Sequence, residues 1–172
     1  PDHTIRTKNW PLIAPAPEDG KLDSFRAGTR AAAAAFMARY RAYFERNNAR
    51  CGGKKRMLDP LPRVVLVPRL GLFGLGRTKK DARIAADLAE AAVETIAGAE
   101  AIGRFESISE ADMFDVEYWS LEQAKLSGAV EKPLAGQIVA ITGAAGAIGA
   151  ATARAFAAAG AEVALLDIDV AA

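Results

Sequence analysis

The stretch QIVAITGAAGAIG, residues 137–149, decides the fold. Residues 137–141 form a short apolar run typical of a buried strand, and residues 142–149 follow as a glycine-containing turn that leads into a helix. Glycine allows the chain to turn tightly and to approach a pyrophosphate without a Cβ atom in the way. The N-terminus of the helix supplies N–H groups and partial positive charge to the phosphates. The stretch therefore predicts a nucleotide site.

The next residues complete a strand–helix–strand unit. A helix of small residues is expected over residues 147–159, Gly160 suits its left-handed end, and residues 162–166 form a second strand. Asp167 follows that strand, close to the position expected of an acid that binds the ribose hydroxyls and disfavours a 2′-phosphate. This order of strand, glycine turn, helix, strand and acid predicts an NAD site, with a purely structural βαβ unit as the alternative.

The upstream part predicts a second α/β layer. We expect extended chain and turns over residues 1–22, a helix that begins at Asp23 and is ended by the asparagines and glycines within residues 47–53, and a strand over 64–67. A glycine-rich turn over 71–76 would lead into a helix over 79–97, capped by Thr78, with a final helix inside 105–126. The predicted core includes Phe25, Phe36, Met37, Tyr40 and Phe44 of the first helix and Ile84, Leu88, Ala91, Ala92 and Thr95 of the second.

The fold class is thus α/β in two parts, with a domain boundary at the polar linker 127–133. Residues 1–130 form the first part, and residues 131–172 form the truncated start of a Rossmann domain. The chain begins and ends as an internal piece of a longer protein would. The turn at 71–76 is interpreted as a structural turn, with phosphate contact through Arg77, Thr78 or Lys79 as the alternative.

Composition excludes several classes of function. The charge is +1, from 22 basic and 21 acidic residues, so no nucleic-acid partner is expected, and the basic loop 50–56 is interpreted as solvated. The single cysteine, Cys51, excludes a disulfide framework and is expected to be an incidental exposed thiol. No apolar run is long enough for a membrane span, and no secretory signal is present, so a cytoplasmic location is expected.

The pattern Thr142-Gly143-x-x-x-Ala147-x-Gly149 resembles the cofactor signature of the short-chain dehydrogenases/reductases. The resemblance implies that Gly143, Gly146, Ile148, Gly149 and Asp167 line the cofactor. It also implies that the catalytic serine and the Tyr-x-x-x-Lys pair lie downstream, so no catalytic residue is assigned in this chain. Tyr118 and Lys125 are seven residues apart and are not that pair.

The chain before the linker resembles the back half of a class II aldolase/adducin-type region. The strings PDHTIRTK (1–8), GLFGLGRT (71–78) and EYWSLEQAKL (117–126) carry this resemblance, and the whole chain is similar to bifunctional rhamnulose-phosphate aldolase/short-chain dehydrogenase proteins. Class II aldolases hold a divalent metal, usually zinc, through histidines. His3 is the only histidine, so the metal ligands are expected upstream. Leucine at position 70 cannot bind metal, and glycine is expected where Arg69 stands.

The resemblance implies metal-dependent cleavage of a ketose 1-phosphate of the rhamnulose type, together with NAD-dependent oxidoreduction of a small hydroxy or aldehyde compound such as lactaldehyde. A homo-oligomer is expected of the full-length protein. The first alternative is a short-chain dehydrogenase acting on another sugar or polyol beside an inactive aldolase region. The second is a non-enzymatic, adducin-like interaction module with a vestigial nucleotide fold.

Overall fold

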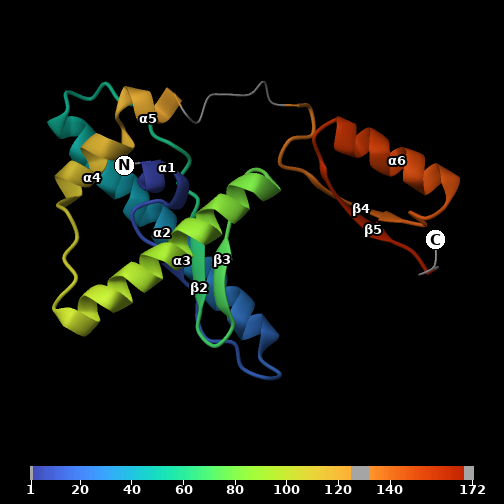
Figure 1. Ribbon diagram of the computed structural model, residues 1–172, viewed down its shortest axis with the longest axis horizontal. Helices are drawn as coiled ribbons and strands as arrows, with labels where there is room; N and C mark the ends of the chain where they lie inside the picture. Colours follow the sequence, from blue (N-terminus) through green and yellow to red (C-terminus); the bar gives the residue numbers. More distant parts are fainter. Residues whose placement is uncertain (1, 125–131, 169–172) are drawn as a thin grey trace. The chain divides into compact units, whose positions relative to one another are not determined.

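The computed structural model describes residues 2–124 and 132–168 (Figure 1). The chain divides into two units, one comprising Pro1–Gly76 and Asp81–Ser127 and the other Arg77–Lys80 and Gly128–Ala172. The predicted boundary between residues 130 and 131 lies outside the described residues. The predicted domain limits therefore stay a prediction, and each unit is considered by itself.

A small mixed sheet forms the centre of the first unit. Its strands are β1 (Leu12–Ile13), β2 (Val64–Val67) and β3 (Gly71–Gly74), in the order β1-β2-β3. β1 runs parallel to β2, and β3 pairs antiparallel to β2 with Val65 opposite Phe73. The strand predicted over 64–67 is confirmed.

The glycine-rich segment 71–76 is not the turn that we predicted from the sequence. Gly71–Gly74 is strand β3, and the turn lies before it, where Leu70 N donates to Val67 O at 3.0 Å. A Cβ on Gly74 would lie 2.1 Å from Ala82 O, and one on Gly76 would lie 2.4 Å from Ala82 N. These two glycines therefore let the following helix pack directly against the strand. The alternative of phosphate contact through Arg77, Thr78 or Lys79 stays a prediction, because residues 75–78 still connect a strand to the helix that begins at Lys79.

Arg69 occupies the hairpin turn with φ 70°, a left-handed conformation that favours glycine. Its Nη2 donates to Pro17 O at 2.9 Å. We expect Arg69→Gly to be more stable than Arg69→Ala by about 1 kcal/mol, since both lose the hydrogen bond and only glycine relieves the backbone strain. Urea unfolding of the two variants measures this difference. An alanine variant at least as stable as the glycine variant would contradict it.

A short helix occupies part of the N-terminal stretch that we predicted to be extended. α1 (Asp2–Thr7) ends at Lys8, which has φ 65°, and its Ile5 is buried. Apart from Pro1, which precedes the helix, the prolines that suggested an extended chain begin at Pro11, after the helix. α1 contacts α4 (Glu110–Glu117), so the helix depends on a partner far away in the sequence.

The buried apolar residues of the first unit form two clusters along α2 (Leu22–Arg50), one against α4 and one against β1 and β2. One cluster contains Tyr40, Tyr43, Phe44, Phe114 and Tyr118, and the other contains Leu12, Ala14, Phe36 and Val67. The predicted core positions Phe36, Tyr40 and Phe44 are confirmed, Phe25 and Met37 are half-buried, and the sequence reading missed Tyr43. Cys51 is half-buried beside the first cluster, so the expectation of an exposed thiol was wrong.

The final helix that we predicted inside 105–126 is two short helices, α4 and α5 (Ser120–Ala124). Ser109 caps α4, because its Oγ accepts a hydrogen bond from Asp112 N at 3.1 Å.

The long helix α3 (Lys79–Ile102) is buried on a different face from the one predicted. Ala85 and Ala89 are buried and Ile84 and Leu88 are half-buried, whereas Ala91, Ala92 and Thr95 are exposed. The prediction failed for the second half of α3, because the helix continues beyond the strands against which it begins (Figure 1).

The second unit contains a parallel strand–helix–strand arrangement. β4 (Ile138–Thr142) leads into α6 (Ala147–Ala158), and β5 (Glu162–Leu166) returns beside β4 with Ile138 opposite Glu162 and Thr142 opposite Leu166. Gly160 has φ 100°, as expected for the left-handed end of the helix. The predicted helix and both predicted strands are confirmed to within one residue at each end.

Within the part of the chain that the structure describes, no helix is both long enough and apolar enough to cross a bilayer.

Candidate functional site

The turn after β4 has the backbone geometry that its glycines allow. Gly143 has φ 66°, and a Cβ placed on it would meet no atom within 4 Å, so the turn is open at this residue. Ala144 N donates to Leu166 O at 3.2 Å, and Gly146 N donates to Gly143 O at 3.2 Å. Gly146 then serves as the N-cap residue of α6. A ligand can therefore approach the backbone at Gly143 without meeting a side chain.

Gly149 is the position where a side chain fits least. A Cβ on Gly149 would lie 2.0 Å from Gly143 O and 2.8 Å from Ala144 Cα. The close approach at Gly149 is therefore between α6 and the turn itself. Gly149 therefore sets the distance between the helix N-terminus and Gly143.

Asp167 lies at the same edge as the turn, because β4 and β5 are parallel and end together. Its Oδ2 accepts a hydrogen bond from Ala145 N at 2.8 Å. Ile148, in the first turn of α6, is 85% exposed. The five residues predicted to line a cofactor thus belong to one edge of the second unit: Gly143, Gly146, Ile148, Gly149 and Asp167.

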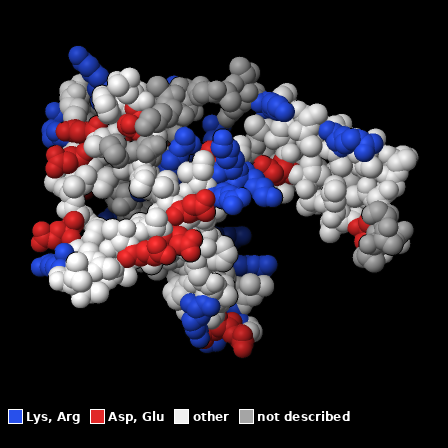
Figure 2. All heavy atoms as spheres, viewed as in Figure 1, with Lys and Arg blue, Asp and Glu red and all other residues white. Residues whose placement is uncertain are grey.

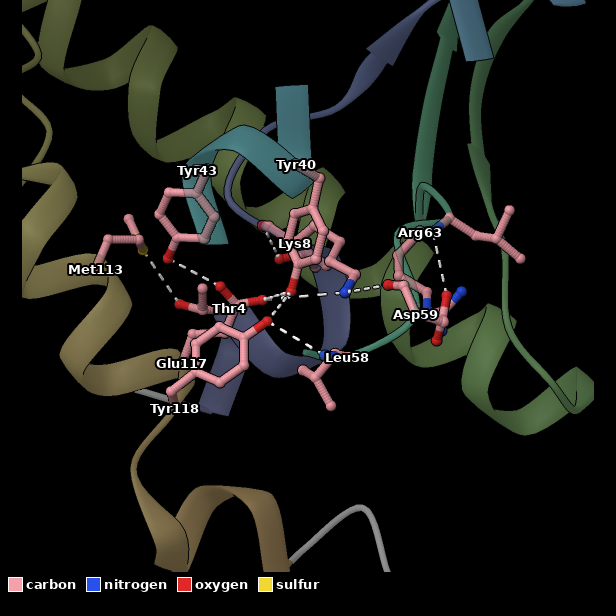
Figure 3. Close-up of polar contacts among 12 residues, drawn as sticks. Thr4, Lys8, Tyr40, Tyr43, Leu58, Asp59, Arg63, Met113, Glu117 and Tyr118 are labelled. Atoms are coloured by element: carbon pink, nitrogen blue, oxygen red, sulfur yellow. Dashed lines mark hydrogen bonds and ion pairs between the residues drawn. The ribbon is translucent and has the colours of Figure 1, made fainter. Parts of the chain in front are cut away.

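The first unit contains a buried polar centre that the sequence reading missed. Glu117 is 0% exposed, and Tyr40 Oη donates to its Oε1 at 2.6 Å while Tyr43 Oη donates to its Oε2 at 2.9 Å. Tyr118 Oη lies 2.7 Å from Tyr40 Oη and accepts from Leu58 N at 3.3 Å. Figure 3 shows the carboxylate of Glu117 between the two tyrosine hydroxyls. We name these residues together with Lys8 the Glu117 centre.

Lys8 brings a buried cation to this centre. Its Nζ donates to Asp59 O at 2.8 Å, lies 4.0 Å from Glu117 Oε1, and lies 4.0 Å from the centroid of the Tyr40 ring (Figure 3). The side chain of Lys8 is 2% exposed. A charge buried this deeply needs partners of this kind, because desolvation is costly.

Burial changes the pKa values of the Glu117 centre. Desolvation raises the pKa of Glu117 and lowers that of Lys8 to about 8. Burial raises the pKa of Tyr118 to about 12, and burial beside the Glu117 carboxylate raises the pKa of Tyr40 and Tyr43 still further. The tyrosines therefore stay neutral donors at ordinary pH. Because the centre is enclosed, its geometry supports joining α1, α2 and α4 rather than reacting with a substrate.

The described residues do not provide the metal site that a class II aldolase uses. They contain no group of three or more histidine, cysteine or acidic side chains that could hold a metal ion. His3, the only histidine of the chain, is exposed. These residues therefore do not fit a catalytic zinc, which requires about three protein ligands.

Comparison with known proteins identifies the class of the first unit. The chain matches the family described as "Aldolase class II, second domain" over residues 1–126 and belongs to this family. The mixed α/β structure, with its helices and small sheets, agrees with that assignment.

A curated relative extends the match across both units. The chain is 34% identical over 172 residues to "Uncharacterized oxidoreductase YuxG" of Bacillus subtilis (strain 168). The match covers 99% of this chain and 24% of that protein, so the chain spans about a quarter of the length of the relative. No solved structure matches the chain.

Proposed function

We propose that the whole protein containing this chain is a bifunctional sugar-catabolic enzyme, in which the second unit begins an NAD-binding domain of the short-chain dehydrogenase type. The turn between β4 and α6 carries this proposal, since it is open at Gly143 and closed to any side chain at Gly149. The oxidoreductase name of the matched relative also supports this proposal.

The residues of the turn fit a pyrophosphate. The first N–H groups of α6 have no acceptor within the helix, and the helix dipole adds partial positive charge there. Gly143 leaves room for the phosphates, and Ile148 offers an apolar surface beside them. Asp167 would accept hydrogen bonds from ribose hydroxyls and repel a 2′-phosphate, which favours NAD over NADP. When bound, NAD would supply hydride transfer.

For the first unit we propose a role in aldol cleavage of a ketose 1-phosphate of the rhamnulose 1-phosphate type. Membership of the class II aldolase family supports this proposal. The divalent metal, which we expect to be zinc, would be held by residues outside this chain, because His3 and the described acids do not form a site. The small hydroxy or aldehyde compound handled by the dehydrogenase would be of the lactaldehyde type, and we propose a cytoplasmic location.

The alternative proposal is a dehydrogenase of another sugar or polyol, fused to an aldolase-like region without activity. The absence of a metal cluster among the described residues is compatible with both proposals. The sequence of the rest of the whole protein would distinguish the two proposals. A His-x-His motif with a third histidine would favour the active aldolase.

A cofactor titration of the full-length protein tests the NAD site. We expect saturable binding of NADH, observed through its fluorescence, and weaker binding of NADPH. Asp167→Ala should weaken NADH binding at least about tenfold, since ribose hydrogen bonds to a charged group are worth roughly 1.5–3 kcal/mol. Gly143→Val should also weaken it, because the added side chain fills the open turn and strains its backbone.

Ala158→Ser, at the far end of α6, is the matched control and should leave NADH binding unchanged. Circular dichroism should show each variant folded. If the full-length protein does not bind NADH, or if Asp167→Ala and Gly143→Val together leave saturable binding intact, the oxidoreductase proposal is wrong.

A further inference from the structure

The second half of α3 has an apolar face that no described residue covers. The buried residues Ala85 and Ala89 lie on one side of the helix, and Ala92, Val93 and Ile96 continue that side at helical spacing. Val93 is 52% exposed and Ile96 is 40% exposed. Such a continuation of a buried face into solvent is typical of an interaction surface.

A hollow lies beside this face, between α3 and the β2–β3 hairpin. It has a volume of about 530 Å³ and is lined by Leu66, Gly71, Leu72, Ala86, Glu90 and Val93. We name the hollow and the exposed half of α3 the α3 groove. Its size and lining suit the side chains of a packed helix.

The α3 groove has acidic edges. Residues 84–103 contain Asp87, Glu90, Glu94 and Glu100 and no lysine or arginine. Figure 2 shows acidic side chains along α3, whereas basic side chains gather near its beginning. Among residues 2–124 and 132–168, Glu90 and Glu94 have no ion-pair partner, while Asp87 lies 4.0 Å from Arg83. The groove therefore favours a basic partner.

α2 presents a surface of the opposite charge. Residues 24–44 contain four arginines and no aspartate or glutamate. Arg39 stacks on the ring of Trp10, and Arg26 lies 3.5 Å from Asp23. In the part of the chain that the structure covers, Arg30 and Arg41 have no ion-pair partner. Between them, the exposed face of α2 is made of alanines: Ala31, Ala34, Ala35 and Ala38.

We propose that the α3 groove binds α2 of a second copy of this chain. Alanines let two helix axes approach to about 8 Å, and Val93 and Ile96 would pack against them. Arg30 and Arg41 would lie against the acidic edge of the groove and determine which partner is accepted.

The position of the two helices determines the type of assembly. α2 packs on the sheet through Phe36 against Val67, whereas α3 packs on the opposite face through Ala86 against Gly74. α3 therefore cannot contact α2 of its own chain in this way. The contact is head-to-tail, which gives a closed ring when the rotation between copies closes.

Charge exchange between the two helices tests the proposal. One variant carries Arg30→Glu and Arg41→Glu, and the other carries Glu90→Arg and Glu94→Arg. In sedimentation equilibrium the full chain should associate, and each variant alone should associate at least about tenfold more weakly, because like charges then face each other. An equimolar mixture of the two variants should associate as tightly as the original chain.

Arg104→Glu combined with Glu106→Arg, in the exposed loop after α3, is the matched control and should leave association unchanged. Val93→Gln should weaken association without changing any charge. Recovery on mixing requires folded chains, so unfolding of a variant cannot imitate it. A monomeric chain, unchanged association of either variant, or no recovery on mixing would overturn the proposal. Binding of α3 to another protein instead would also overturn it.

Discussion

Replacing Glu117 with alanine should lower the free energy of unfolding by about 3–5 kcal/mol, the usual cost of removing one partner from a buried charged network. The hydroxyls of Tyr40 and Tyr43 would lose their acceptor, and Lys8 would lose the nearest carboxylate. Urea unfolding followed by tryptophan fluorescence measures the loss.

Glu106→Ala is the control for this change, since Glu106 is an exposed acid in the loop before α4 and should cost less than about 0.5 kcal/mol. The stability cost of Glu117→Gln should lie between those of Glu117→Ala and Glu106→Ala, because the glutamine amide keeps the shape of the side chain and one acceptor oxygen. If Glu117→Ala costs no more than the control, the Glu117 centre does not stabilise the first unit as we infer.

Replacing Lys8 with methionine should remove a pH-dependent part of the stability between about pH 8 and pH 10.5. Burial lowers the pKa of Lys8 from 10.5 to about 8, so the folded chain binds this proton less tightly than the unfolded chain does. The stability that neutral Lys8 contributes is present above pH 10.5 and is lost as the pH falls to about 8. The contribution of Lys8 to the free energy of unfolding therefore differs by about 3 kcal/mol between the two ends of this pH range, at 1.36 kcal/mol for each unit of difference in pKa.

The free energy of unfolding of the original chain should therefore rise over this pH range relative to that of Lys8→Met. Lys54→Met, at an exposed lysine of the basic loop, should leave the pH dependence as it is. Comparison with this control accounts for the titration of the other lysines and of the tyrosines, which all three chains share. Equal slopes for the original chain and Lys8→Met would show that Lys8 is not desolvated in solution.

The second unit was predictable because its signals are local. A strand, a turn and a helix follow one another within residues 137–160, and the glycines needed by the turn lie in that same stretch. The structure places Asp167 beside the turn, because the parallel strands β4 and β5 end at one edge. Whether this edge binds NAD stays a prediction.

The first unit was predictable only in part. The segment 71–76 is rich in glycine, and glycine favours both turns and close packing, so its local sequence could not distinguish a turn from a strand under a helix. α1 was missed for a similar reason, because a six-residue helix is not stable by itself and depends on its contact with α4.

The sequence alone determined where the long helices and the parallel unit lie, because helical and strand periodicity and glycine geometry act over a few neighbouring residues. The tertiary structure alone decided the partners of Glu117 and the uncovered face of α3. Tyr40 and Tyr43 are more than 70 residues from Glu117 in the chain. A carboxylate in a helix looks like a solvated residue until the fold removes it from water, and no local pattern records that desolvation.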